Sequence, residues 1–197
     1  MKRIALLLLA LAMMAAPALA GPSIADPEIE RLSPLFDSIT RAFDDGDAGP
    51  ADNDNPAFIW LSLFYLETNY GESVKGAVLT EDYLYVALPH RAVLEAAQAM
   101  FYGLQSLPPI PSFLTEWDSV MYDAGSDAYH FMLSDMGCSF TRIDDVSRNG
   151  DGLIRVEVGY YAGGEEEDFM DALTFLLDEN PAEGSAYRYA IVSVGRG

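Results

Sequence analysis

The sequence predicts one α+β domain in which N-terminal helices pack on a curved antiparallel sheet. In the first half of the chain, apolar residues recur every three or four positions, which is the period of an amphipathic helix. From Asp118 onward they alternate in short runs separated by turn residues, as in antiparallel strands. The order helix-helix-hairpin-helix-meander is buried most simply by a sheet that wraps around its helices.

The first 20 residues are typical of a secretory signal peptide. Lys2 and Arg3 form a positive n-region, residues 4–14 form a short apolar region, and Ala18-Leu19-Ala20 offers a small-residue cleavage site. Cleavage after Ala20 leaves 177 of the 197 residues, enough for one domain at 21–197. We therefore expect an extracytoplasmic protein, periplasmic or secreted. The longest later apolar stretch, 58–66, is far shorter than the ~20 residues of a membrane span.

Two helices are predicted before residue 71. The first carries an apolar stripe over 29–43, with Asp26 as its N-cap and Pro27 in its first turn. Pro34 either kinks this helix or restarts it with Ser33 as a new cap. After a polar loop at 44–55, the cap signal Asn55-Pro56 introduces a buried helix over 58–70, which ends at Gly71.

A hairpin and a third helix follow. Residues 74–78 and 83–88 are short β-prone runs around a polar turn, and Pro89 then opens a helix whose apolar side runs from Val93 to Leu104. The proline-rich segment 107–112 serves as a connector. Six further strands are predicted at 120–122, 129–133, 139–146, 153–162, 172–177 and 187–194. The last of these is apolar on both faces, so we expect it in the interior of the sheet.

This element order resembles the cone-shaped fold of the nuclear-transport-factor-two-like superfamily, which is also grouped with cystatin-like folds. The resemblance covers the expected domain as topology and supplies no motif residues, so it implies a fold and not a function. A fainter likeness is to secreted cell-wall endopeptidase inhibitor domains. It depends on Leu88-Pro89 leading into the helix at 93–101 and on the closing strand at 187–194.

Charge restricts the kinds of partner. The chain carries a net charge of −20, which becomes −22 when Lys2 and Arg3 leave with the signal peptide. Such a surface repels nucleic-acid backbones, which excludes nucleic acid as a partner and leaves neutral ligands, basic partners and divalent cations. Cys138 is the single cysteine and cannot form an intramolecular disulfide. We expect it to be a small buried residue, with a dimer-forming thiol as the alternative.

Neither a metal site nor a catalytic site is predicted. The segment 145–154 has the Asn-Gly-Asp-Gly core of a calcium loop, but Ser147 and Val158 replace its acidic end ligands, so a hairpin turn is favoured. The acidic runs at 44–54 and 165–168 are interpreted as solvated loops. His90 and His130 have no evident catalytic partner in the sequence, and phosphate-binding and hydrolase motifs are absent from it. No cofactor is predicted.

Aromatic side chains are the remaining candidates for binding. Core filling is the simpler interpretation for most of them. If the sheet encloses a pocket, the residues expected to line it are Trp60, Trp117, Tyr122, Tyr160 and Tyr189.

The sequence therefore favours a non-enzymatic binding module for a small apolar ligand or a protein partner. One alternative is an inhibitor of an envelope hydrolase that uses the acidic loop at 44–54. Another is a small hydrolase or isomerase, which requires His90 or His130 beside a carboxylate inside a pocket. The oligomeric state is left open.

Overall fold

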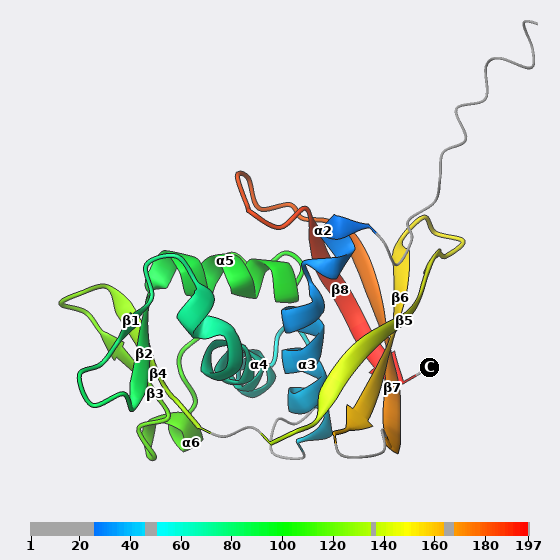
Figure 1. Cartoon of the computed structure of the whole chain (residues 1–197). Helices are drawn as coiled ribbons and strands as arrows, with labels where there is room; N and C mark the ends of the chain where they lie inside the picture. Colours follow the sequence, from blue (N-terminus) through cyan, green and yellow to red (C-terminus); the bar gives the residue numbers. More distant parts are fainter. Residues whose placement is uncertain (1–25, 46–50, 135–136, 164–167, 197) are drawn as a thin grey trace, which may run out of the picture.

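A layer of helices lies between two antiparallel sheets in the computed structural model (Figure 1). The structure describes residues 26–45, 51–134, 137–163 and 168–196. The signal peptide, part of the polar loop at 44–55 and most of the acidic run at 165–168 lie outside these residues, so the expectations for them stay predictions. The α+β class predicted from the sequence is confirmed.

The N-terminal helices begin at the predicted signals. The Asp26 side chain accepts the N–H of Glu28 and caps α2, and the Asn55 side chain accepts the N–H of Ala57 and caps α4. At Pro34 the chain restarts a helix instead of kinking one, although the N-cap of α3 is Leu32 and not Ser33. The helical elements are α2 (Pro27–Glu30), α3 (Ser33–Asp44), α4 (Pro56–Tyr70), the short 3-10 helix η2 (Gly71–Ser73), α5 (His90–Met100) and α6 (Ser112–Thr115).

The first sheet covers one side of the helical layer in the order β1-β2-β4-β3. Its strands are β1 (Val78–Leu79), β2 (Tyr85–Pro89), β3 (Val120–Asp123) and β4 (Ala128–Met132). β3 and β4 are predicted at nearly these bounds, and they pair with Tyr122 opposite Tyr129. The strand predicted over 74–78 is wrong in its extent, because the chain is still turning through Gly76 at a φ of 91° and pairs with β2 from Val78.

The second sheet is a meander of longer strands in the order β5-β6-β7-β8. They span β5 (Phe140–Arg148), β6 (Ile154–Ala162), β7 (Asp168–Glu179) and β8 (Tyr189–Arg196). The predicted hairpin between β5 and β6 is confirmed. Its turn is built by the Asn149 side chain, which accepts the N–H groups of Asp151 and Leu153 at 3.0 and 2.9 Å, and by Gly152 at a φ of 88°.

The prediction that the closing strand is interior is wrong. Within the described part of the chain, β8 pairs with β7 alone and forms an edge of the second sheet. It is apolar because Tyr189, Ala190 and Ile191 are buried. Its outer edge is also covered, because the N–H of Tyr102, just after α5, donates to the Ile191 carbonyl at 2.9 Å. A covering loop protects this edge in place of the charge or proline that edge strands usually carry.

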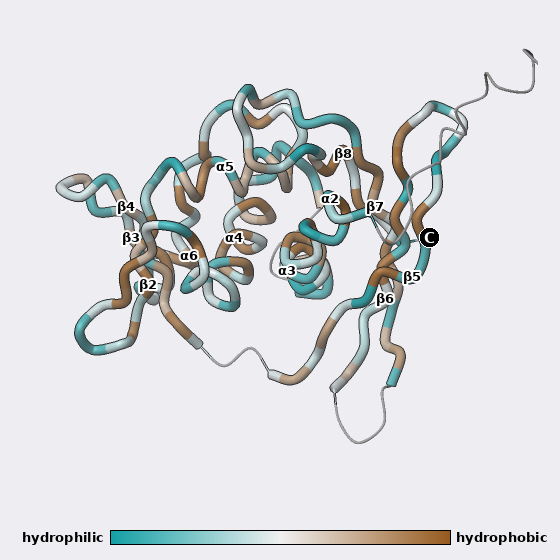
Figure 2. The backbone as a smooth tube through the Cα atoms, turned by 45° about the horizontal axis from the view of Figure 1, so that its top comes forward, coloured by the Kyte–Doolittle hydropathy of each residue, from teal (hydrophilic) through white to brown (hydrophobic). Residues whose placement is uncertain are grey.

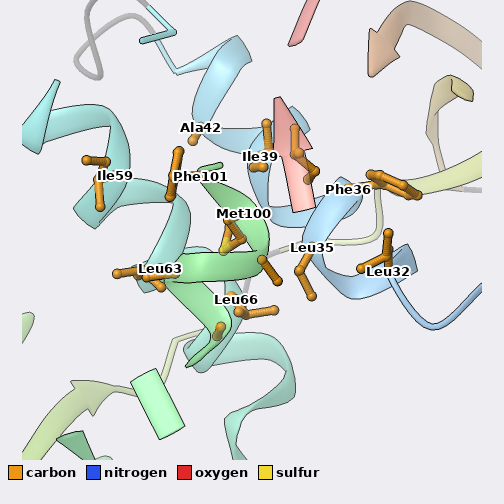
Figure 3. Packing of buried hydrophobic residues seen from close by; sticks show 14 of the residues in the cluster. Leu32, Leu35, Phe36, Ile39, Ala42, Ile59, Leu63, Leu66, Met100 and Phe101 are labelled. Carbon is orange, nitrogen blue, oxygen red and sulfur yellow. The ribbon is translucent and has the colours of Figure 1, made fainter. Parts of the chain in front are cut away.

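Strands of the two sheets pack on different helices: β4 packs on α4, whereas β5 packs on α3 and β8 packs on α5. A helix that is apolar all round needs cover on every side, and α4 buries residues from Phe58 to Thr68. Side chains of α3, α4 and α5 interdigitate at the centre (Figure 3). The apolar segments of the helices and of the facing strands lie inward, whereas hydrophilic turns lie at the periphery (Figure 2). Among the described helices, none combines the length and apolarity needed to cross a membrane.

Candidate functional site

A cavity of about 640 Å³ opens where the helical layer meets the loop before β8, and we call it the Glu67 pocket. Its volume lies within the range of small-molecule sites. Five segments form it: the α2–α3 junction, the end of α4, the turn after η2, the start of α5 and the β7–β8 loop. The residues that line this cavity include Arg31, Pro34, Leu66, Glu67, Tyr70, Val74, Lys75, Arg91, Ala92, Glu95, Ala96 and Tyr187.

Glu67 is placed by α4, the most apolar helix of the molecule. The helix begins at the Asn55 cap and its last turn packs toward β2, so a carboxyl at position 67 is 2% exposed. Gly71 leaves room for it, because a methyl group there would lie 3.2 Å from Glu67 Oε2 and 3.2 Å from Val86 Cγ1. Glu67 Oε2 therefore sits against apolar side chains.

The carboxyl of Glu67 lacks the partners that buried acids normally have. Within the described residues, Glu67 Oε2 is buried and has no hydrogen-bond partner. Because burial disfavours the charged form, the pKa of Glu67 is raised from 4.5 to about 8. At neutral pH this group is a neutral carboxylic acid, which can donate one hydrogen bond and accept others.

The rim of the pocket carries three basic side chains. Arg31 ends α2, Lys75 follows η2, and Arg91 lies in the first turn of α5. The Arg31 guanidinium lies over the Tyr187 ring, 5.4 Å from its centroid. Burial, and secondarily the Glu67 carboxyl, raise the pKa of Tyr187, so its hydroxyl stays protonated at neutral pH. The remaining wall is aliphatic, formed mainly by proline, leucine, valine and alanine.

Tyr70 links the pocket to a polar cluster inside the protein. Its hydroxyl donates to Asp37 Oδ2 at 3.1 Å, and Arg41 Nε donates to the same oxygen at 2.9 Å. Burial, with Asp37 adding to it, raises the pKa of Tyr70 to about 12. Arg41 continues to Ser139, which receives its Nη1 at 3.0 Å and also the Tyr160 hydroxyl at 3.0 Å. The cluster therefore joins α3, α4 and the start of the second sheet.

The structure does not gather the five aromatic residues predicted to bind a ligand, and within the described chain none of them lines the Glu67 pocket. Trp60 is fully buried and donates from Nε1 to the Pro108 carbonyl at 2.8 Å. Trp117 is 75% exposed. Tyr122 is exposed and reaches Trp60 only through the ring of Tyr129, 4.8 Å from the first and 5.1 Å from the second.

The other two lie in the second sheet. Tyr160 is buried in the polar cluster, and Tyr189 is buried under Arg188, whose guanidinium lies 5.1 Å from its ring centroid. Trp60 lies on α4 and packs against Tyr129 of the first sheet, whereas Tyr160 lies on β6 and Tyr189 on β8. These tyrosines contribute to core packing and to hydrogen bonding within the fold.

His90 has a carboxylate partner, but the pair lies at the surface. Its Nδ1 is 3.3 Å from Asp127 Oδ1, and the Tyr122 hydroxyl donates to the same oxygen at 2.7 Å. The His90 and Asp127 side chains are 36% and 71% exposed. Water reaches both groups, so the pair lacks the enclosed setting that the hydrolase alternative requires. His130 lies opposite Met121 in the β3–β4 ladder.

Metal-ligating and thiol groups offer no competing site. In the described ranges, no cluster of three or more His, Cys, Asp or Glu side chains is arranged to hold a metal ion. The expectation that Cys138 is buried is wrong. It is exposed, and its Sγ lies 3.1 Å from the Gly163 carbonyl oxygen, because the chain ends of β5 and β6 approach closely there.

Sequence reasoning missed Glu67, although a signal for it exists. Glu67 is the one charged residue in the helix Pro56–Tyr70, and it falls between Leu66 and Thr68 on a segment predicted to be buried. A charged residue in such a segment is a candidate for a functional group. Comparison of the chain with protein-family models, with curated proteins and with solved structures finds no match, so the interpretation of this site depends on its geometry alone.

Proposed function

We propose that the protein is a non-enzymatic binding module that holds a small, partly apolar molecule in the Glu67 pocket. The observation that carries the proposal is a buried carboxyl, enclosed by apolar side chains, on a residue that lines a cavity of ligand size. A neutral carboxyl at the wall of a cavity can donate one hydrogen bond and accept others, and a polar group of a ligand can use them. Of the two kinds of partner expected from the sequence, this cavity favours a small molecule over a protein.

We also propose that the protein works outside the cytoplasm, on the strength of the signal-peptide pattern at residues 1–20. The intact mass of the exported protein should correspond to a chain that begins at Gly21. A mass that includes Met1 would contradict this part of the proposal.

Binding is tested with N-phenyl-1-naphthylamine, an uncharged apolar fluorophore whose emission rises in an apolar site. We expect saturable binding to the parent protein. The substitution Ala92→Trp places an indole in the pocket wall and should weaken this binding by at least about tenfold, because the ring occupies the cavity.

The matched control is Ala124→Trp, which adds the same side chain in the exposed turn between β3 and β4. It should bind the fluorophore like the parent. Thermal melts of both variants verify that they are folded. Equal binding by Ala92→Trp and the parent would place the fluorophore outside the Glu67 pocket and contradict the proposed function.

A further inference from the structure

The rim of the Glu67 pocket concentrates positive charge on a strongly negative protein. The chain has 11 lysines and arginines against 31 aspartates and glutamates, yet Arg31, Lys75 and Arg91 all line this one cavity. None of the three takes part in an ion pair between described residues. They come from three separate segments, so the fold and not local sequence brings them together.

The acidic groups of the same pocket offset only part of this charge. Glu95 contributes one negative charge against three positive ones, and its Oε1 accepts the N–H of Ala186, which ties that carboxylate to the β7–β8 loop. Glu67 is enclosed by apolar groups and holds a proton at neutral pH. The pocket therefore combines basic side chains at its rim with a neutral hydrogen-bond donor in its wall.

We propose, building on the proposed function, that the Glu67 pocket selects a small monocarboxylate with an apolar body. Its carboxylate would accept a hydrogen bond from the Glu67 hydroxyl within the field of the three rim cations. Its apolar part would contact the wall formed by Leu66, Val74 and Ala96. A cationic ligand would instead face three like charges on entry.

The charge of the whole chain limits the charge of the ligand. At a net charge of −20 the protein repels anions at a distance, and the repulsion grows with the number of charges on the ligand. The rim cations offset this repulsion for one charged head group, whereas the aliphatic wall formed by Leu66, Val74 and Ala96 offers no partner to a second charge. A monoanion is therefore favoured over a phosphate ester or a dicarboxylate.

The experiment compares three ligands that share an eight-carbon chain and differ at the head: octanoate, octanamide and octylamine. Calorimetric titration of the full protein at pH 6.5 should give the tightest binding for octanoate, by at least about tenfold over octylamine. Octanamide should lie between them. Binding of octanamide or octylamine as tight as that of octanoate would overturn the inference.

The Glu67 proton gives a second readout. Octanoate stays ionised from pH 6.5 to 9, so its affinity should fall about tenfold over this range as Glu67 loses its proton. Glu67→Gln keeps a neutral donor at this position and should bind octanoate at pH 6.5 within about threefold of the parent, without the loss at pH 9. A parent affinity that does not change with pH would contradict the role of Glu67.

The rim is tested with two variants that change the net charge equally. Arg91→Gln should weaken octanoate binding by about three- to tenfold, whereas Arg148→Gln, at the distant β5–β6 turn, should change it less than about twofold. Equal effects would show that only the overall field matters and would overturn the inference. If the uncharged fluorophore binds in the pocket but octanoate does not, the ligand class is wrong and the proposed function stands. If neither binds, the proposed function fails.

Discussion

Asp37 on α3 and Glu67 on α4 are buried to the same degree, 3% and 2% exposed, but their surroundings differ. Asp37 receives hydrogen bonds from Arg41 and Tyr70, and a longer one of 3.4 Å from Thr141. Glu67 Oε2 receives none from the described residues and lies among aliphatic groups. Both acids connect to Tyr70, one by a hydrogen bond and the other by lining the same pocket.

The difference shows that burial alone does not assign a role to a carboxyl. Asp37 is compensated by a cation and by hydroxyl donors, so its position serves the fold. Glu67 is not compensated, so it is held neutral and keeps unused hydrogen-bonding capacity. We therefore propose Glu67, and not Asp37, as the carboxyl that serves ligand binding.

The largest effect is expected for Asp37→Ala, which leaves the buried Arg41 guanidinium without its carboxylate. Breaking a buried pair in this way should lower the free energy of unfolding by about 3–5 kcal/mol, measured by urea denaturation. The control is Asp171→Ala, which breaks the more exposed pair with Arg196 and should cost less than about 1 kcal/mol. Similar losses in the two variants would contradict a structural role specific to the Asp37 cluster.

The next effect is a pH dependence that belongs to Glu67. Its folded pKa of about 8 lies above the ordinary 4.5, so its contribution to stability is fully present below pH 4.5 and is lost as the pH rises through about 8. Glu67→Gln cannot ionise. The variant should therefore gain stability relative to the parent across this range, by an amount on the order of a few kcal/mol.

Chemical denaturation at pH 5, 7 and 9 measures this difference. Glu72→Gln, an exposed position one turn further along the chain, serves as the control and should follow the profile of the parent. If the free energies of unfolding of Glu67→Gln and the parent differ by the same amount at all three pH values, Glu67 does not ionise with a raised pKa in the folded protein.

The smallest effect is expected for Tyr70→Phe, which removes the hydroxyl shared with Asp37 but keeps the ring at the pocket. Stability should fall by about 1 kcal/mol, the net value of one hydrogen bond. Fluorophore binding should stay within about twofold of the parent, because the wall of the pocket is retained. Tyr102→Phe, at a similarly exposed tyrosine, should change neither quantity. A large loss of binding without a loss of stability would assign the Tyr70 hydroxyl to the ligand and not to Asp37.

Local signals in the sequence were sufficient for most of the secondary structure. These signals act over a few residues, so their effect can be predicted without knowledge of the fold. They are the caps at Asp26 and Asn55, the prolines after them and the Asn-Gly-Asp-Gly turn. The same holds for the β3–β4 register, which alternation and the four-residue turn at 124–127 determine together. The division of the strands between two sheets was not predictable in this way. It depends on which helix each strand packs on, β4 on α4 and β5 on α3, and these contacts join segments that are distant in the sequence.

The sequence by itself determined the α+β class, the order of the elements and the acidic character of the chain. Export, which the pattern at residues 1–20 predicts, stays a prediction. The tertiary structure alone decided where β8 lies, that the five candidate aromatic residues are dispersed, and that Arg31, Lys75 and Arg91 meet around Glu67. The physical reason is the distance along the chain over which each interaction acts. Periodicity and capping act between residues that are neighbours along the chain, whereas a pocket and the pKa of a buried acid depend on groups from distant segments that meet only when the core closes.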